Sequence, residues 1–243
     1  MENHFYTELA KYYDKIYHYV DYNEQVDFFL KLINKFGARN NKKILDLACG
    51  TGKHAGILSK KGLDVAGVDL SEEMLKEARK NYPGMRLEKG DMRTWIDGNK
   101  FSAIVIFFNS ILYNNTKAGF LETLKNCYSQ LEEKGLLIFD AVDKTIGINS
   151  KPSRINYSDN NLKISFSPRW VYKPGDDYLD LEINFVVNGK KIHDHHLMGA
   201  FTLREQKALA EKVGFDVIVL KRGFKQIKRV GRSDKKAIFV CRK

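Results

Sequence analysis

The first half of the chain alternates between hydrophobic residues at helical spacing and short apolar runs. Between residues 24 and 36, Val26, Phe29, Leu30 and Ile33 recur at the spacing of one helical face, and Gly37 follows as an end signal. Apolar runs predict strands at 44–47, 63–69, 85–88, 101–108 and 135–142, and helical patterns after Gly52, after Ser71 and over 118–131 separate them. Repeated strand–helix units predict an α/β fold with a doubly wound, parallel sheet.

The pattern changes to strict alternation between residues 153 and 201. Segments 162–172 and 178–187 alternate, and the Asn188-Gly189 pair after them is typical of a type I′ hairpin. We therefore predict an antiparallel insert at 153–201, with the main domain formed by 1–152 and 202–243. Thr202 and Glu205 have capping-box spacing at the start of a helix, and strands at 217–220 and 237–241 are predicted to form a final hairpin.

Composition narrows the class of protein further. The 243 residues are 43% hydrophobic, which suits one α/β domain with an elaboration. Neither an apolar run of the ~18 residues that a membrane span needs nor the apolar core of a signal peptide is evident. The three cysteines are scattered, so we expect neither a disulfide framework nor a cysteine metal site, and a cytoplasmic location is the expectation.

The charge is strongly and unevenly positive. The formal net charge is +11, and Asp234 is the only acid between residues 221 and 243. This balance suits an anionic partner such as nucleic acid, a phosphorylated small molecule or an acidic surface. A solvated, lysine-rich face is the alternative interpretation.

A glycine-rich turn between the first strand and the next helix indicates a nucleotide site. Gly50 and Gly52 permit positive φ and a close approach of the backbone to a ligand at a helix N-terminus. Together with Ala55 they satisfy the loose dinucleotide fingerprint. Both an NAD enzyme and an S-adenosylmethionine (SAM) enzyme would have this loop.

Acidic residues at three successive strand ends favour SAM. Asp69 can accept hydrogen bonds from both ribose hydroxyls. Asp46, just before the loop, would repel a pyrophosphate but attract the ammonium and sulfonium groups of SAM. Asp91 can accept from the adenine amine, while the backbone N–H of Met92 meets a ring nitrogen.

The stretches "ILDLACGTGKH", "VAGVDLSEEML", "EKGDMRTW" and "FSAIVIFFNSILY" resemble successive motifs of class I SAM-dependent methyltransferases over roughly residues 40–142. The resemblance implies a Rossmann-like, seven-stranded sheet whose last strand is antiparallel. It also implies that Asp69 holds the ribose, that Leu70 and Met92 line the adenine, and that Gly50 and Gly52 approach the methionine portion. Further cofactor contacts follow from it at Tyr22, Ala48 and Met74.

The N-terminal pattern Tyr13-Asp14-x-x-Tyr17, followed by Asp21-Tyr22, resembles the helical lid of sugar N,N-dimethyltransferases. That resemblance implies that Tyr13 lies at the reacting centre and that the insert covers the active site and helps to form a homodimer. It implies three further groups of residues: Phe107 and Phe108 beside the cofactor; Tyr17, Asn109 and Ser110 toward the substrate; Tyr113 and His196 as catalytic groups. The sequence departs from that group in the short segment between Tyr17 and Tyr22 and in having Asn109 where a small hydroxyl residue is usual.

Histidines cluster at residues 193–196. Strand alternation places His193 and His195 on one face and His196 on the other. Adjacent histidines can bind metal, but no acid or cysteine cluster completes a site, so we expect a half-exposed strand face and no metal site. An acid–base role for His196 is the alternative.

These observations predict a SAM-dependent methyltransferase of a small-molecule amine, such as an amino sugar or amino acid. An RNA methyltransferase that uses the basic C-terminal face is the alternative. Against RNA, the Asn-Pro-Pro-Tyr type of motif is absent after the fourth strand, where the sequence reads Phe108-Asn109-Ser110-Ile111. A SAM binder without catalysis is the third hypothesis.

Overall fold

The computed structural model describes residues 4–37 and 43–243. Residues 1–3 of the predicted main domain, and the start of the motif region at 40–42, lie outside the described residues. Four strands of the main sheet are β1 (Lys43–Leu47), β2 (Asp64–Asp69), β3 (Arg86–Lys89) and β4 (Phe101–Ile106). The others are β5 (Leu131–Val142), β10 (Asp216–Lys221) and β11 (Lys236–Arg242).

The predicted seven-stranded sheet is confirmed. Its order is β10-β11-β5-β4-β1-β2-β3, and β1 to β5 pair in parallel. β11 runs antiparallel to both β5 and β10, so the predicted final hairpin and the antiparallel last strand are also confirmed. The carboxyl ends of β1, β2 and β4 therefore meet at one edge of the sheet, where ligands bind in open α/β folds.

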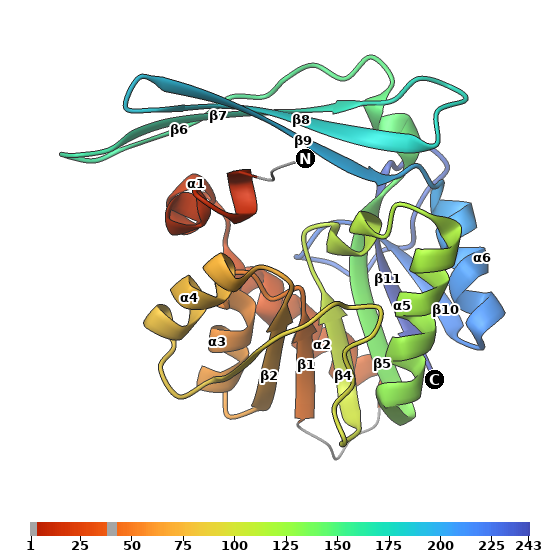
Figure 1. The fold of residues 1–243 in the computed structure, drawn as a ribbon. Helices are drawn as coiled ribbons and strands as arrows, with labels where there is room; N and C mark the ends of the chain where they lie inside the picture. Colours follow the sequence, from red (N-terminus) through yellow and green to blue (C-terminus); the bar gives the residue numbers. More distant parts are fainter. Residues whose placement is uncertain (1–3, 38–42) are drawn as a thin grey trace.

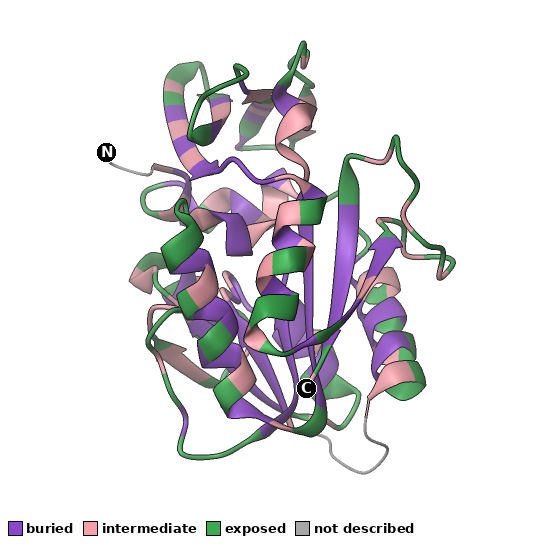
Figure 2. Cartoon of the chain, turned by 90° about the vertical axis from the view of Figure 1, so that its right-hand side faces the viewer, coloured by how far each residue is buried: buried purple, intermediate pink, exposed green. Residues whose placement is uncertain are grey.

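Helices cover both faces of this sheet (Figure 1). α2 (Tyr22–Phe36) and α3 (Lys53–Lys60) share one apolar cluster with Val65, Ile238 and Val240. α5 (Lys117–Gln130) and α6 (Leu203–Val213) share another with Phe139 and Phe239. Buried residues therefore follow the central strands and the inner sides of the helices (Figure 2). Over residues 4–37 and 43–243, no helix combines the length and the apolar character that crossing a bilayer requires.

The alternating segment forms a second sheet with strand order β6-β7-β8-β9. Its strands are β6 (Ile155–Ser158), β7 (Lys163–Val171), β8 (Tyr178–Val187) and β9 (Lys190–Gly199), all paired antiparallel. Positive φ at Asn188 (47°) and Gly189 (88°) confirms the predicted I′-type turn between β8 and β9. The capping box of Thr202 and Glu205 is confirmed at the start of α6.

The N-terminal segment, residues 4–19, lies between the two sheets (Figure 1). It contains η1 (His4–Tyr6), η2 (Ala10–Tyr12) and α1 (Tyr13–Ile16). Phe5, Leu9, Tyr13 and Ile16 are buried with Met74 of α4 (Glu72–Asn81) and with apolar residues of the second sheet. This third apolar cluster connects the glycine-loop edge of the main sheet to the second sheet.

Several predicted bounds are wrong for local reasons. α2 starts at Tyr22, because the Asp21 side chain caps it by accepting from the N–H of Glu24, and Leu30 is only partly buried. β4 ends at Ile106, because Phe108 turns into the left-handed region. β5 starts at Leu131 rather than 135, with a register shift against β4. The short β3 is Arg86–Lys89 instead of 85–88.

Candidate active site

The glycine loop joins β1 to α3 through three residues at positive φ. Ala48, Gly50 and Gly52 have φ values of 62°, 56° and 76°. Gly52 is the N-cap residue of α3, and a Cβ there would lie 3.1 to 3.3 Å from Met85, Ala78 and Tyr82. The positive φ values predicted for both glycines are confirmed, and backbone N–H groups at the start of α3 face the carboxyl edge of the sheet.

Asp69 organises this loop. Its Oδ2 accepts from the Gly50 N–H at 2.7 Å, and its Oδ1 accepts from the Ser71 N–H at 2.8 Å. Burial raises the pKa of the Asp69 carboxyl, and these N–H groups act against the rise. The next residue, Leu70, is 65% exposed. The predicted ribose carboxylate therefore also determines the position of the loop.

Asp46 lies under the loop with 1% of its surface exposed. Within the described part of the chain, neither carboxylate oxygen accepts a hydrogen bond of normal geometry. Burial, followed by the charge of Asp69, raises the pKa of Asp46 to about 8, and the backbone N–H of Ala55 opposes the rise. A buried, unpaired carboxylate is costly unless a cation compensates it. Asp46 thus fits the positively charged methionine end of SAM.

Gly90, Asp91 and Met92 follow β3. Asp91 binds the guanidinium of Arg93 at 2.6 Å, and this hydrogen-bonded partner lowers the pKa of the Asp91 carboxyl. The Met92 sulfur lies 3.2 Å from the side-chain amide of Asn114. Asp91 and Met92 therefore follow the carboxyl end of β3, which pairs with β2. This is the edge of the sheet where the sequence predicted the adenine to bind.

A cavity lies above the glycine loop. The predicted residues that line it are Tyr13, Tyr22, Ala48, Gly50, Phe107, Phe108 and Ser110. Sequence reasoning missed four others, namely Cys49, Thr51, Lys53 and His54. Of the described residues, the remaining predicted ones lie outside this lining: Tyr17, Asp46, Gly52, Asp69, Leu70, Met74, Asp91, Met92, Asn109, Tyr113 and His196. Cys49, Thr51 and Lys53 lie within or directly beside the glycine motif, and this position was the signal that could have found them. His54 lines the cavity because it lies in the first turn of α3.

His54 and Tyr22 shape the inner end of the cavity. Burial lowers the pKa of His54 to about 3, and its Nε2 pairs with Gln25 Oε1 at 2.8 Å. The His54 ring packs against Phe107 at a tilt of 33°, with 4.0 Å between centroids. The Tyr22 hydroxyl is buried and has no hydrogen-bond partner within the described residues. An uncharged imidazole and a free hydroxyl suit a cationic ligand.

The loop after β4 carries two consecutive non-glycine residues at positive φ, Phe108 (57°) and Asn109 (61°). Such strain persists where surrounding contacts enforce it. Here Asp140 Oδ1 accepts from the Asn109 N–H at 3.3 Å. Arg222 donates to Asn109 Oδ1 at 3.1 Å and pairs with Asp140 Oδ2 at 2.9 Å. Sequence reasoning missed Arg222, because it considered the basic C-terminal stretch only as a whole and singled out none of its residues.

The N-terminal segment is fastened to the glycine loop. Asp14 Oδ1 accepts from the Thr51 hydroxyl at 2.6 Å, and Asp14 Oδ2 lies 3.6 Å from Lys53 Nζ. The backbone carbonyl of Tyr6 accepts from the Ser71 hydroxyl at 2.5 Å. These contacts hold Tyr13 over the cavity, whereas Tyr17 packs against Phe108 with 5.2 Å between ring centroids.

A buried hydrogen-bond chain runs from the N-terminal segment into β9. The Tyr6 and Tyr113 hydroxyls are 2.7 Å apart, and the Tyr113 hydroxyl bonds His196 Nδ1. His196 Nε2 lies 3.3 Å from Asp194 Oδ2, which also accepts from the Phe5 N–H at 2.8 Å. His196 is 1% exposed, so the half-exposed strand face expected for the histidine cluster is wrong at this residue. Tyr6 and Asp194 belong to this buried chain, although the sequence analysis did not single them out.

A second expectation, about the surroundings of His193 and His195, is wrong on the outer face of β9. His193 and His195 do lie on the opposite face from His196, as alternation predicted. The expectation that no acid accompanies them is wrong, because Asp180 and Glu182 of β8 lie beside His195. Acids on a neighbouring strand leave no signal in the spacing of the histidines.

Comparisons with known proteins agree with this geometry. A family model described as a methyltransferase domain matches residues 44–135. The protein named "Putative methyltransferase YqeM" of Bacillus subtilis is 31% identical over 224 residues, covering 87% of each chain. The dTDP-3-amino-3,4,6-trideoxy-alpha-D-glucopyranose N,N-dimethyltransferase of Streptomyces venezuelae is 40% identical over 97 residues, covering 40% of this chain and 41% of that enzyme.

Among solved structures, Streptomyces venezuelae DesVI superposes with a TM-score of 0.82 and 27% identity, covering 96% of this chain and 97% of that chain. The chain therefore belongs to the class I SAM-dependent methyltransferases. SAM is its methyl donor, and the fold and methyltransferase activity expected from the sequence are confirmed.

Proposed function

We propose that this enzyme transfers the methyl group of SAM to the nitrogen of a small-molecule amine, with an amino sugar as the favoured class. One observation carries the proposal: aromatic rings of the N-terminal segment, of the loop after β4 and of the second sheet pack together above the glycine loop. The rings of Tyr13, Tyr17 and Phe108 form a continuous series over this region. Such an enclosure suits a small acceptor.

The bound donor supplies an activated methyl group on a sulfonium, so the protein has to bind, align and exclude water. Asp69 and the backbone of the glycine loop would hold the nucleoside. The buried Asp46 carboxylate would neutralise the cationic end. The faces of the Tyr13 and Tyr22 rings at the cavity wall would contact the positive charge of the sulfonium.

The chain Tyr113–His196–Asp194 would meet the acceptor from above. An amine must present a neutral lone pair to attack the methyl carbon, and it must lose a proton after the transfer. The Tyr113 hydroxyl would accept a hydrogen bond from that amine. Tyr6 would first have to move aside, because its hydroxyl contacts the Tyr113 hydroxyl in this structure. His196 and Asp194 would then orient Tyr113 from β9.

The Streptomyces venezuelae relative acts, by its name, on the amino group of a nucleotide-linked sugar. Its similarity extends over 40% of this chain, so it supports the amine class more than a particular sugar. Arg222 pairs with the buried Asp140, so its charge is compensated, and only its remaining N–H groups would suit an anionic part of the acceptor. Its guanidinium reaches inward to Asn109 beside the cavity residues Phe108 and Ser110. This inward direction favours a small ligand over RNA as the reason for the basic stretch.

The test uses SAM labelled on its methyl group. The purified protein is incubated with labelled SAM and a metabolite extract, and small molecules are separated from precipitable RNA and protein. We expect label in the small-molecule fraction, on an amine that mass spectrometry identifies. The control is Asp69→Asn, which removes one carboxylate acceptor beside the loop and should abolish the signal. Label in a ribonuclease-sensitive precipitate would overturn the proposal in favour of RNA.

A further inference from the structure

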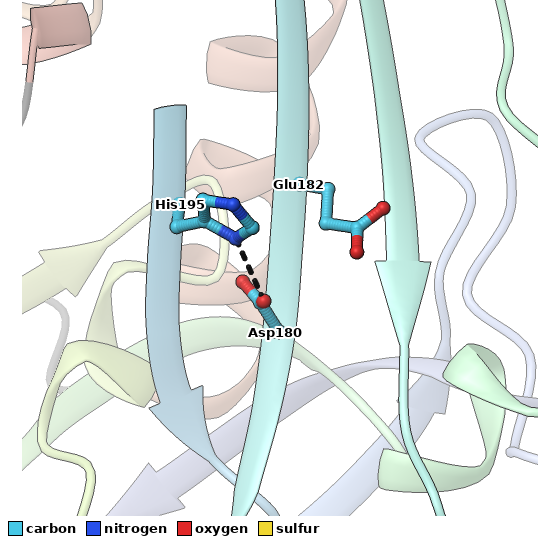
Figure 3. A group of neighbouring side chains, drawn as sticks. All are labelled: Asp180, Glu182 and His195. Carbon is cyan, nitrogen blue, oxygen red and sulfur yellow. Dashed lines mark hydrogen bonds and ion pairs between the residues drawn. The ribbon is translucent and has the colours of Figure 1, made fainter. Parts of the chain in front are cut away.

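The outer face of β8 and β9 gathers nitrogen and oxygen ligands away from the active site. His193 and His195 project from β9, and Asn184 and Glu182 are their direct cross-strand partners on β8. Asp180 occupies the next position on the same face of β8. Ligand atoms of Asp180, Glu182 and His195 all lie within 4.8 Å of one another. Figure 3 shows the His195 ring directed at Asp180, with the Glu182 carboxylate on the same side of the sheet and turned away from the ring.

Hydrogen bonds constrain which nitrogen of each imidazole carries the proton. His195 Nδ1 lies 2.9 Å from Asp180 Oδ2, and an ionised carboxylate only accepts, so Nδ1 is the donor. His193 Nδ1 lies 2.7 Å from the side-chain amide of Asn184, which presents its oxygen to that nitrogen. With this amide orientation, both Nε2 atoms of the neutral rings present lone pairs.

The two Nε2 atoms face each other. His193 Nε2 and His195 Nε2 are 2.7 Å apart. With Asn184 presenting its oxygen, two neutral imidazoles leave this contact unsatisfied, and a metal ion between the rings would satisfy it. Nitrogens bound to one tetrahedral zinc at about 2.0–2.1 Å would be roughly 3.3 Å apart, so a modest rotation of the rings would admit the metal.

We propose that this face binds a borderline divalent cation of the zinc class through His193 Nε2, His195 Nε2 and the Glu182 carboxylate. Two imidazoles with a carboxylate form a donor set that suits Zn²⁺, Co²⁺ or Ni²⁺. Asp180 and Asn184 hold the second nitrogen of each ring, as the outer partners of metal-bound histidines do. Arg169 of β7 is the cross-strand partner of Glu182, and its Nε donates to the Ser150 carbonyl at 3.2 Å.

The site is independent of methyl transfer. Asp194 and His196 point to the opposite face of β9 and are buried, whereas His193 is exposed. Metal binding is therefore measured on the complete protein without an acceptor substrate, and its failure would leave the proposed function untouched.

The experiment titrates Co²⁺ and Zn²⁺ into full-length protein that lacks a polyhistidine tag and has been stripped with a chelator. We expect one equivalent of Co²⁺ to give a visible d–d absorption band, and Zn²⁺ to displace it with a matching calorimetric stoichiometry. His193→Ala should weaken binding at least tenfold, and Glu182→Gln should weaken it less. His193 is exposed, so its replacement should leave the fold intact, which circular dichroism verifies.

The matched control is His18→Ala, an exposed histidine on the N-terminal segment, and it should bind like the wild type. Equal affinity in the wild type and in His193→Ala would overturn the proposal, as would the absence of a Co²⁺ band at millimolar metal. A band lost in both His193→Ala and His18→Ala would overturn it as well, because the metal would then not be held specifically by β9.

Discussion

At the scale of single residues, Asp46 shows how a cofactor site can reduce the stability of the protein that holds it. A buried carboxylate without hydrogen-bond partners favours its neutral form, which is why the pKa of Asp46 rises to about 8. The folded chain then keeps a proton that the unfolded chain releases near pH 4. Stability from this group is complete below the unfolded pKa and is lost as the pH rises through the folded pKa.

We therefore predict that Asp46→Asn stabilises the protein without SAM, and that the gain depends on pH. The difference in free energy of unfolding should grow by up to about 1.4 kcal/mol per pH unit between about pH 4 and pH 8, and level off above. Denaturant unfolding of both proteins over that range measures it, while calorimetry should find weaker SAM binding by the variant. A stability difference that stays constant with pH would show that Asp46 is ionised in the folded chain.

At the scale of elements, α1 fastens the N-terminal segment to the glycine loop. Asp14 accepts from Thr51 at 2.6 Å and Asn81 at 3.4 Å, and it pairs with Lys53. These partners come from the glycine loop, α3 and α4, so one carboxylate secures the N-terminal segment over the cavity. Closing segments of this kind commonly control ligand entry and release.

Asp14→Ala should speed the dissociation of SAM roughly fivefold, which corresponds to the loss of about 1 kcal/mol of hydrogen bonding. Global stability should change little, because the Asp14 side chain is a quarter exposed, at 25%. Stopped-flow displacement of bound SAM measures the rate. Glu8→Ala, on the same segment, removes an exposed carboxylate that pairs with His4, and SAM should dissociate from this variant as it does from the wild type. An unchanged rate for Asp14→Ala would exclude a fastening role.

At the scale of the whole molecule, Phe5 joins the two sheets. Its ring is 2% exposed and lies 5.1 Å from Tyr13, 5.8 Å from Phe166 and 5.2 Å from Phe185. Its backbone N–H also bonds Asp194. The third apolar cluster therefore centres on a residue near the start of the described chain.

Phe5→Ala should cost about 3–5 kcal/mol locally, as expected for removing a buried ring. We expect hydrogen exchange to speed up in residues 4–19 and in β7 to β9, and to stay slow in β1, β4 and β5. Phe120→Ala, in the cluster under α5, is the comparison and should act on the main sheet instead. Uniform loss of protection by Phe5→Ala would mean that both sheets unfold as one cooperative unit.

The sequence predicted the main sheet well, because its strands are apolar runs punctuated by glycines and caps. The glycine loop, Asp46 and Asp69 were found for the same reason, since local spacing encodes a strand–turn–helix. Arg222, Asp194 and the acids beside His195 were not found. Each reaches its partner across more than ten residues or from a neighbouring strand, so only the three-dimensional pairing brings them together. Tyr6 was overlooked because its ring resembles any other aromatic residue of the N-terminal stretch.

The four residues His193 to His196 place the two proposed sites on one strand, one on each face. Alternation ties them together: deleting a single residue before His193 would turn the acid–imidazole pair toward solvent and direct the outer histidines into the aromatic interior. A one-residue change in the register of β9 therefore moves the residues of both faces together. Any variant of this enzyme that changes the length of the β8–β9 hairpin must therefore do so in steps of two, or rebuild both surfaces at once.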